Sequence, residues 1–261
     1  MVRHPHYILV LLILLSGCKE KHYALTGTEL GMVTMHDSLD LEDDAIEDMI
    51  EPYKEQLEDK MNKVIGYSSR AMGKPKEIMK AGNAESELGN LMADLVLFQT
   101  QQRARSAGEP VPTICILNMG GIRTSLPKGA ITVGNIYEIM PFDNIVKVQR
   151  LNATQMEKMF NYLAREGGQP ISGFTMGIKN GKPIDIQIGE FPFDPAKDQE
   201  YHVVTSDYLA NGGDRMEFFK NSTNTGDYGL LRDMIIEHFE YLSEEDMEAD
   251  AQVDGRIYYD K

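Results

Sequence analysis

The sequence predicts a mixed α/β domain in which strands and helices alternate and at least one pair of strands forms a hairpin. Several segments carry apolar residues at three- and four-residue steps, and short apolar runs are interleaved with them. The Asn180-Gly181 pair between two such runs is a strong hairpin signal, which excludes a purely parallel sheet. There is no internal repeat or low-complexity linker, so one domain is favoured.

The first long helix is expected over residues 41–65, after a tether that includes a short strand at 32–35. Apolar residues such as Ile46, Ile50, Tyr53 and Leu57 follow helical spacing there and predict one buried stripe. Pro52 lies inside this pattern, and an interior proline costs about 3 kcal/mol. We therefore expect either a kink at Pro52 or a second helix that has Pro52 in its first turn.

The remaining elements follow from the same two patterns. Helices are expected where apolar residues keep helical spacing: 85–101, 154–165 and 232–239. Strands are expected in short apolar runs: 114–117, 131–133, 145–148, 174–178, 184–188 and 201–205. Two glycine-containing loops follow strands, at 118–123 and at 206–214.

Composition excludes several classes of protein. The net charge of −15, with no sustained basic stripe, argues against nucleic-acid binding. Two cysteines, Cys18 and Cys115, can form neither a disulfide framework nor a cysteine zinc site. The acidic stretches 37–59 and 237–254 are interpreted as solvated helix faces, with a cation-binding tail as the alternative.

The first residues have the pattern of an export signal. Arg3 precedes a nine-residue apolar run, 7–15, which is too short to span a bilayer. The run ends in Leu15-Ser16-Gly17-Cys18, which resembles the bacterial lipobox. The resemblance implies cleavage before Cys18 and acylation of that cysteine, hence a membrane-anchored protein. Lys19, rather than aspartate, favours the outer membrane. The alternative is a buried N-terminal helix with an accidental cysteine.

Candidate binding residues gather in the two loops. Gly120-Gly121 and Gly212-Gly213 permit positive φ and close approach of backbone to a ligand. The Arg123 guanidinium offers a planar fork of donors, and Asp214 offers acceptors suited to ribose hydroxyls. Phe142 and Tyr208 stand in loops, and a purine between two aromatic faces gains about 1–3 kcal/mol per contact. Taken singly, the aromatic residues could serve packing, Arg123 a surface ion pair and Asp214 a turn cap.

Four blocks, in order, carry a resemblance to the C-terminal domain of the 5′-nucleotidase family over about residues 40–257. They are Leu88-Gly89-Asn90 within 85–94; 118–123 with 129–132 and 140–144; 208–214; and Gly255-Arg256-Ile257. The resemblance implies that Phe142 and Tyr208 sandwich a base, that Asn118 hydrogen-bonds it, and that Arg123 and Asp214 hold the ribose. It places Gly120, Gly121, Asn144, Gly212 and Gly213 in the same site.

Two positions depart from the family pattern. A basic residue usually stands shortly before the Leu-Gly-Asn block, and Lys80 is only an approximate substitute. Arg215-Met216 replace the usual glycine and aromatic residue after Asp214. Arg215 is expected either to crowd the site or to supply a replacement cation.

The family's catalytic half has no counterpart in this sequence. Its metal-binding motifs are absent, and the six histidines lack ligand spacing. The expected organisation is a signal peptide (1–17), a tether (18–40), a connector helix (41–66) and a 5′-nucleotidase C-terminal-like domain (67–261). We expect no cofactor in this chain, which would be inactive alone. Divalent metals would be carried by a separate metallophosphoesterase chain that completes a split 5′-nucleotidase acting on a nucleoside monophosphate.

The sequence leaves two other functions open. One is a non-catalytic lipoprotein that captures nucleosides or nucleotides for scavenging. The other is a structural remnant that binds no purine.

Overall fold

The computed structural model describes residues 44–260. The chain divides into two compact units, residues 1–49 and 50–261, of which the first is described only from residue 44. The expected signal peptide, Cys18 and the expected strand at 32–35 lie outside the described residues.

Helix α2 (Asp44–Asn62) carries Pro52 in its interior and continues past it, so the expected second helix starting at Pro52 is wrong. The predicted helix also ended too late. Val64 belongs to strand β1 (Val64–Ser68), which pairs antiparallel with β3 (Gly129–Thr132). Val64 and Ile65 keep the helical spacing from Met61, but they lie in the strand. The expected buried stripe of α2 is also wrong, because Ile46, Tyr53 and Leu57 are exposed.

The central sheet has five strands in the order β10-β4-β9-β2-β5. The strands are β2 (Ile114–Ile116), β4 (Ile145–Asn152), β5 (Ile171–Ser172), β9 (Glu200–Ser206) and β10 (Thr223–Leu230). β2 runs parallel to β9, whereas the other neighbours are antiparallel. The sheet is therefore mixed, as the sequence predicts.

A second sheet of four strands has the order β11-β6-β7-β8. Its strands are β6 (Phe174–Lys179), β7 (Lys182–Ile188), β8 (Phe191–Pro192) and β11 (Ile257–Tyr259). The predicted hairpin between β6 and β7 is confirmed: Asn180 and Gly181 both have positive φ, at 52° and 70°. A tight two-residue hairpin needs positive φ at both loop residues, because the turn then matches the right-handed twist of the strands.

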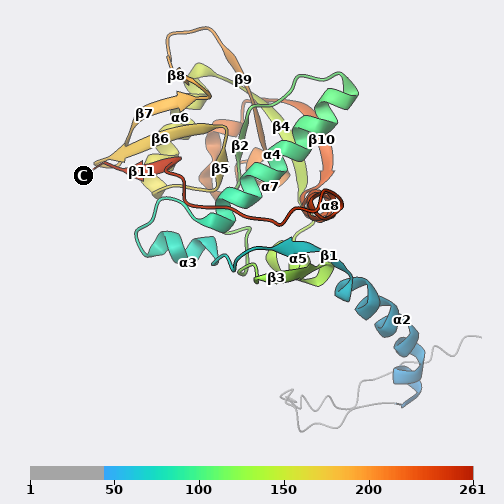
Figure 1. The fold of residues 1–261 in the computed structure, drawn as a ribbon. Coiled ribbons are helices and arrows are strands. Elements are labelled where there is room, and N and C mark those ends of the chain that lie inside the picture. Colours follow the sequence, from blue (N-terminus) through green and yellow to red (C-terminus); the bar gives the residue numbers. More distant parts are fainter. Residues whose placement is uncertain (1–43, 261) are drawn as a thin grey trace, which may run out of the picture. The chain divides into compact units, whose positions relative to one another are not determined.

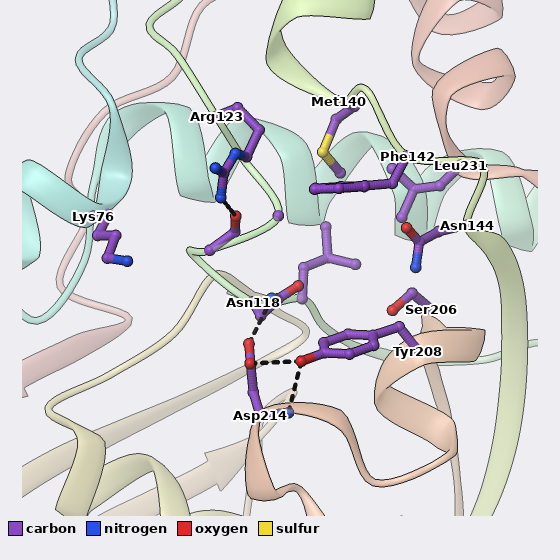
Figure 2. Close-up of a pocket in the computed structure, with 13 residues that line it drawn as sticks. Lys76, Asn118, Arg123, Met140, Phe142, Asn144, Ser206, Tyr208, Asp214 and Leu231 are labelled. Carbon is purple, nitrogen blue, oxygen red and sulfur yellow. Dashed lines mark hydrogen bonds between the residues drawn. The ribbon is translucent and has the colours of Figure 1, made fainter. Parts of the chain in front are cut away.

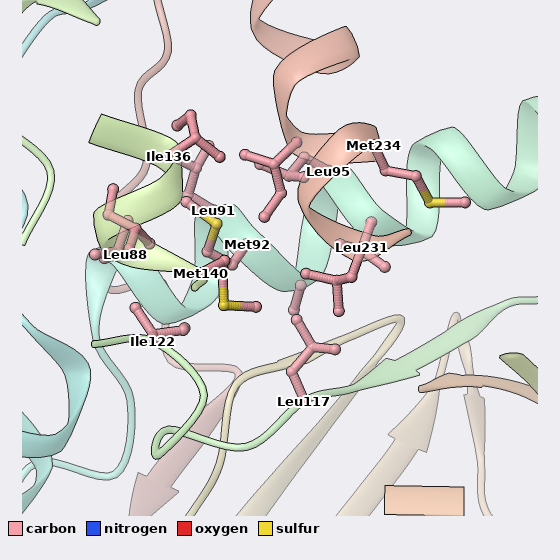
Figure 3. Packing of buried hydrophobic residues seen from close by; sticks show 14 of the residues in the cluster. Leu88, Leu91, Met92, Leu95, Leu117, Ile122, Ile136, Met140, Leu231 and Met234 are labelled. Atoms are coloured by element: carbon pink, nitrogen blue, oxygen red, sulfur yellow. The ribbon is translucent and has the colours of Figure 1, made fainter. Parts of the chain in front are cut away.

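Helices lie on both faces of the central sheet (Figure 1), and side chains of its inner strands enter two buried clusters. Alternate side chains along one strand point to opposite faces. Cys115 and Val204 therefore join the core cluster with α4 (Glu87–Ala107) and α8 (Leu231–Glu244), while Ile116 and Val203 join the cluster with α6 (Ala153–Glu166). Figure 3 shows the first cluster, where side chains of α4, α5 (Val133–Ile139) and α8 meet.

Several short elements were not predicted from the sequence. They are α3 (Pro75–Lys80), α5 (Val133–Ile139), α7 (Asp207–Ala210) and the 3₁₀ turns Gly213–Arg215 and Glu217–Phe219. Val133, expected in a strand, instead begins α5. Thr132 and Asn135 form a capping box there, which satisfies free N–H groups and starts the helix. Of the helices in residues 44–260, none combines the length and apolar character needed to cross a membrane.

Candidate functional site

Three loops meet at one edge of the central sheet because of how its strands run. β2 and β9 are parallel, so both end at this edge, and β4 begins there because Val146 pairs with Ser206 in the antiparallel direction. The loops 117–123, 140–144 and 206–214 are consequently neighbours. The carboxyl ends of parallel strands are a common location for ligand sites in α/β sheets.

A cavity of about 450 Å³ lies between these loops. Its apolar floor is formed by Leu117, Met140 and Leu231, which also belong to the core cluster (Figure 3). Eight of the ten predicted binding residues line it: Asn118, Gly120, Gly121, Arg123, Phe142, Asn144, Tyr208 and Asp214. Gly212 and Gly213 do not line it. The apolar floor is continuous with the core.

Phe142 and Tyr208 form opposite walls of the cavity (Figure 2). Their side chains come from different loops and are 48% and 47% exposed, so neither is packed into the core. The interpretation of these residues as packing residues is therefore wrong. Two exposed aromatic faces across one cavity can accept a flat ring between them.

Asp214 is held by a hydrogen-bond network at the polar end of the cavity (Figure 2). Its Oδ2 accepts from Asn118 Nδ2 at 2.6 Å, and its Oδ1 accepts from the Tyr208 hydroxyl at 2.9 Å. The Asp214 backbone N–H donates to the same hydroxyl oxygen at 3.2 Å. The bond that the Tyr208 hydroxyl donates to Asp214 raises the pKa of Tyr208, so the phenol stays a donor at neutral pH. Since a carboxylate accepts about four hydrogen bonds, Asp214 can still accept from ligand hydroxyls.

The backbone around Asp214 is strained. Asp214 and Arg215 have φ values of 49° and 63°, in the left-handed region that side chains disfavour. Gly212 has the expected positive φ, whereas Gly120, Gly121 and Gly213 do not. Gly213 is required for a different reason: a Cβ there would lie 2.6 Å from the Tyr208 ring and from its carbonyl oxygen.

Two cations face the cavity, Arg123 and Lys76 (Figure 2). Arg123 Nη1 donates to the carbonyl of Gly120 at 3.1 Å, and its guanidinium lies 5.8 Å from the centre of the Phe142 ring. Within residues 44–260 neither cation has a carboxylate partner. Both charges are therefore available to an anionic ligand.

The two basic residues noted where the sequence departs from the family pattern, Lys80 and Arg215, lie outside the cavity. Lys80 does not line the cavity, and the basic residue on α3 that does is Lys76, which sequence reasoning missed. Arg215 pairs with Glu166 at 3.1 Å and lines another cleft, so it neither crowds the site nor replaces a cation there. Met216 is fully buried in the core cluster with α6.

The described residues do not fit a metal centre. Residues 44–260 contain no group of three or more His, Cys, Asp or Glu side chains placed to hold a metal ion. Cys115 is buried, and burial raises the pKa of its thiol, which keeps it protonated.

Comparison with known proteins gives a consistent result. Residues 64–221 match the family model of the 5′-nucleotidase C-terminal domain. The chain is 28% identical to the trifunctional nucleotide phosphoesterase protein YfkN of Bacillus subtilis, over 80% of this chain and 14% of that protein. It is 27% identical to 5′-nucleotidase of Homo sapiens, over 64% of this chain and 33% of that protein.

A solved structure shares the fold. The 5′-nucleotidase precursor of Thermus thermophilus superposes with a TM-score of 0.65 at 24% identity, covering 84% of this chain and 43% of that one. The chain thus spans less than half of that structure, about a third of the human enzyme and a smaller share of the Bacillus protein.

Proposed function

The chain belongs to the family of 5′-nucleotidase C-terminal domains, and we propose that it is the nucleotide-binding subunit of a split 5′-nucleotidase. It binds the nucleoside end of a nucleoside monophosphate. A separate metallophosphoesterase chain carries the divalent metals and hydrolyses the phosphate. The single observation that carries the proposal is the pair of aromatic walls, Phe142 and Tyr208, beside the polar network of Asp214.

This arrangement defines one orientation for a bound nucleotide. A base lies between Phe142 and Tyr208 above the apolar floor, and the ribose hydroxyls reach Asp214. Because Asn118 donates to Asp214, we assign Asn118 to the ribose end rather than to the base. In Figure 2, Lys76 lies on the side of this polar network away from the two aromatic rings. The 5′-phosphate therefore extends from the ribose toward Lys76, with Arg123 above it.

The contribution to catalysis is positional. Binding energy from the base and ribose, which do not react, holds the phosphate in one orientation. Metal ions held by the partner chain would supply the activation of water and the charge that neutralises the phosphoryl oxygens. In this chain, the core-backed floor and the Asp214 network hold the nucleoside still while the phosphate is presented outside the cavity.

A second candidate is a lipoprotein that captures nucleosides for scavenging, without a catalytic partner. The observation that favours it is that the aromatic walls, the floor and the Asp214 network all come from this one chain. Such a protein binds adenosine at least as tightly as adenosine 5′-monophosphate (AMP), since the phosphate contributes nothing to its task.

The test is to purify the protein with its natural partners and to assay AMP hydrolysis. We expect a metallophosphoesterase chain to co-purify, and its rate at low AMP concentration to rise at least about tenfold when this chain is added back. The Tyr208→Ala variant should give no such rise. Tight AMP or adenosine binding without any partner or rate increase would contradict the split enzyme and support scavenging.

For the location of the protein, we propose a lipid anchor on Cys18 in the bacterial outer membrane. The lipobox-like Leu15-Ser16-Gly17-Cys18 supports it, and two or more acyl chains suffice for stable anchoring. Cys18→Ala should move the protein from the membrane fraction to the soluble envelope fraction. An unchanged distribution would contradict the anchor.

A further inference from the structure

We infer that Arg232, which lies outside the cavity, is a positioning residue for ligand binding because it holds the loop that carries Phe142. Where the inference concerns nucleotide affinity, it rests on the proposed function. Nothing in the sequence motifs singles out Arg232, which is the second residue of α8.

Among the described residues, the hydrogen bonds and ion pair of Arg232 are all with the segment around Phe142. Its Nη2 donates to Asp143 Oδ1 at 2.5 Å, and its Nη1 donates to the Met140 carbonyl at 3.3 Å. Its guanidinium carbon lies 4.0 Å from the centre of the Tyr137 ring, at the end of α5. The guanidinium thus joins α8, α5 and the loop 140–144.

The position is a costly one for a cation. Arg232 is only 6% exposed, and burying a charge is unfavourable unless it is paired. Its Nε has no hydrogen-bond partner within residues 44–260. It also lies in the first turn of α8, where the helix dipole disfavours positive charge. The ion pair and hydrogen bonds that Arg232 makes within residues 44–260 are with Asp143 and Met140, so the loop 140–144 supplies its compensation.

Phe142 depends on these contacts because little else fixes it. Its side chain is half exposed, and its ring contacts only the Arg123 guanidinium among charged or aromatic groups of the described residues. On either side of Phe142, Arg232 holds the Met140 carbonyl and the Asp143 side chain. The Leu231 N–H donates to the Asn144 carbonyl at 2.8 Å. Loss of the Arg232 contacts should therefore make the loop that carries Phe142 mobile while the domain stays folded.

The chain contains no tryptophan, so Phe142→Trp places a single fluorescent reporter in the loop. In this background we compare Arg232→Lys with Arg256→Lys as the matched control. Arg256 is similarly buried, with 13% of its side chain exposed, and pairs with Asp94 and Asp254 away from the cavity. Lysine keeps the charge in both variants but cannot form the two-point contact of a guanidinium.

We expect Arg232→Lys to increase acrylamide quenching of the reporter and to lower its anisotropy. In the protein with Phe142 intact, Arg232→Lys should weaken AMP binding about tenfold. Arg256→Lys should lower the melting temperature but change neither fluorescence nor affinity. Asp143→Ala, at a largely exposed carboxylate, should reproduce Arg232→Lys, and the two should not be additive. It serves as the second variant if Arg232→Lys does not fold.

The inference is overturned if Arg232→Lys or Asp143→Ala destabilises the protein but leaves quenching and affinity as in the Arg256 control. If wild-type protein binds neither AMP nor adenosine, the proposed function fails. The fluorescence comparison still decides whether Arg232 positions the loop.

Discussion

Replacing either Phe142 or Tyr208 by alanine should weaken binding of AMP and of adenosine alike, by about 5- to 150-fold. Each ring supplies one stacking face, and such contacts contribute about 1–3 kcal/mol per base. Tyr208→Ala should have the larger effect, because it also removes the hydroxyl that holds Asp214. Calorimetric titration with both ligands measures the effect.

The control for this prediction is Phe191→Ala. Phe191 is 73% exposed and lines a different cleft, so its removal changes aromatic content without touching the cavity. Affinity within twofold of wild type in Phe142→Ala and Tyr208→Ala would show that the two rings are not walls of a binding site. The structural-remnant interpretation would then be favoured.

Replacing Lys76 by alanine should weaken AMP binding about fivefold and leave adenosine binding unchanged. One exposed charge contact contributes about 1 kcal/mol, and only AMP has the phosphate that Lys76 is placed to meet. Because such contacts are screened by salt, wild-type affinity for AMP should fall with ionic strength more steeply than that of the variant. Titrations at two salt concentrations measure both effects.

Lys158→Ala makes the same charge change at an exposed lysine that lines another cleft. It should leave the preference for AMP over adenosine as in wild type. An equal loss of AMP affinity in both lysine variants would mean that the overall charge of −15, rather than Lys76, sets the preference. An equal loss of AMP and adenosine binding in Lys76→Ala would place the phosphate elsewhere.

The aromatic walls could be identified because they lie in blocks that resemble the 5′-nucleotidase C-terminal domain, whereas taken singly either ring could serve packing. Phe142 and Tyr208 lie in loops, outside the apolar periodicity that marks core residues. The order of the strands brings the two loops together. The inner strands of the central sheet could be predicted from local sequence patterns. Apolar runs such as Ile114–Ile116 are buried on both faces and stand out in the sequence.

Lys76 could not be predicted, because nothing local marks it. It lies in a six-residue helix, too short for a periodic signal, and it reaches the cavity only through the tertiary fold. The burial of Arg232 could not be predicted either, because its place in the sequence indicates an exposed residue. An arginine in an amphipathic helix is normally solvated, and only packing against α5 and the loop 140–144 reveals its burial.

Strand β10 was missed because its residues, Thr223–Leu230, contain glycine and polar side chains and it lies at the edge of the sheet. Edge strands are often polar, since one side faces solvent. The helix α5 was missed because Val133 favours strands by itself. The capping box at Thr132 and Asn135 outweighs that preference.

The left-handed backbone at Asp214 and Arg215 has a consequence for protein engineering. Both residues store strain that glycine or asparagine would relieve, so substitutions selected only for thermal tolerance would tend to accumulate there. At Arg215 the exchange removes only a surface pair with Glu166. At Asp214 it removes the carboxylate around which the polar end of the cavity is organised. Stabilisation and ligand recognition are therefore opposed at one residue and compatible at the next.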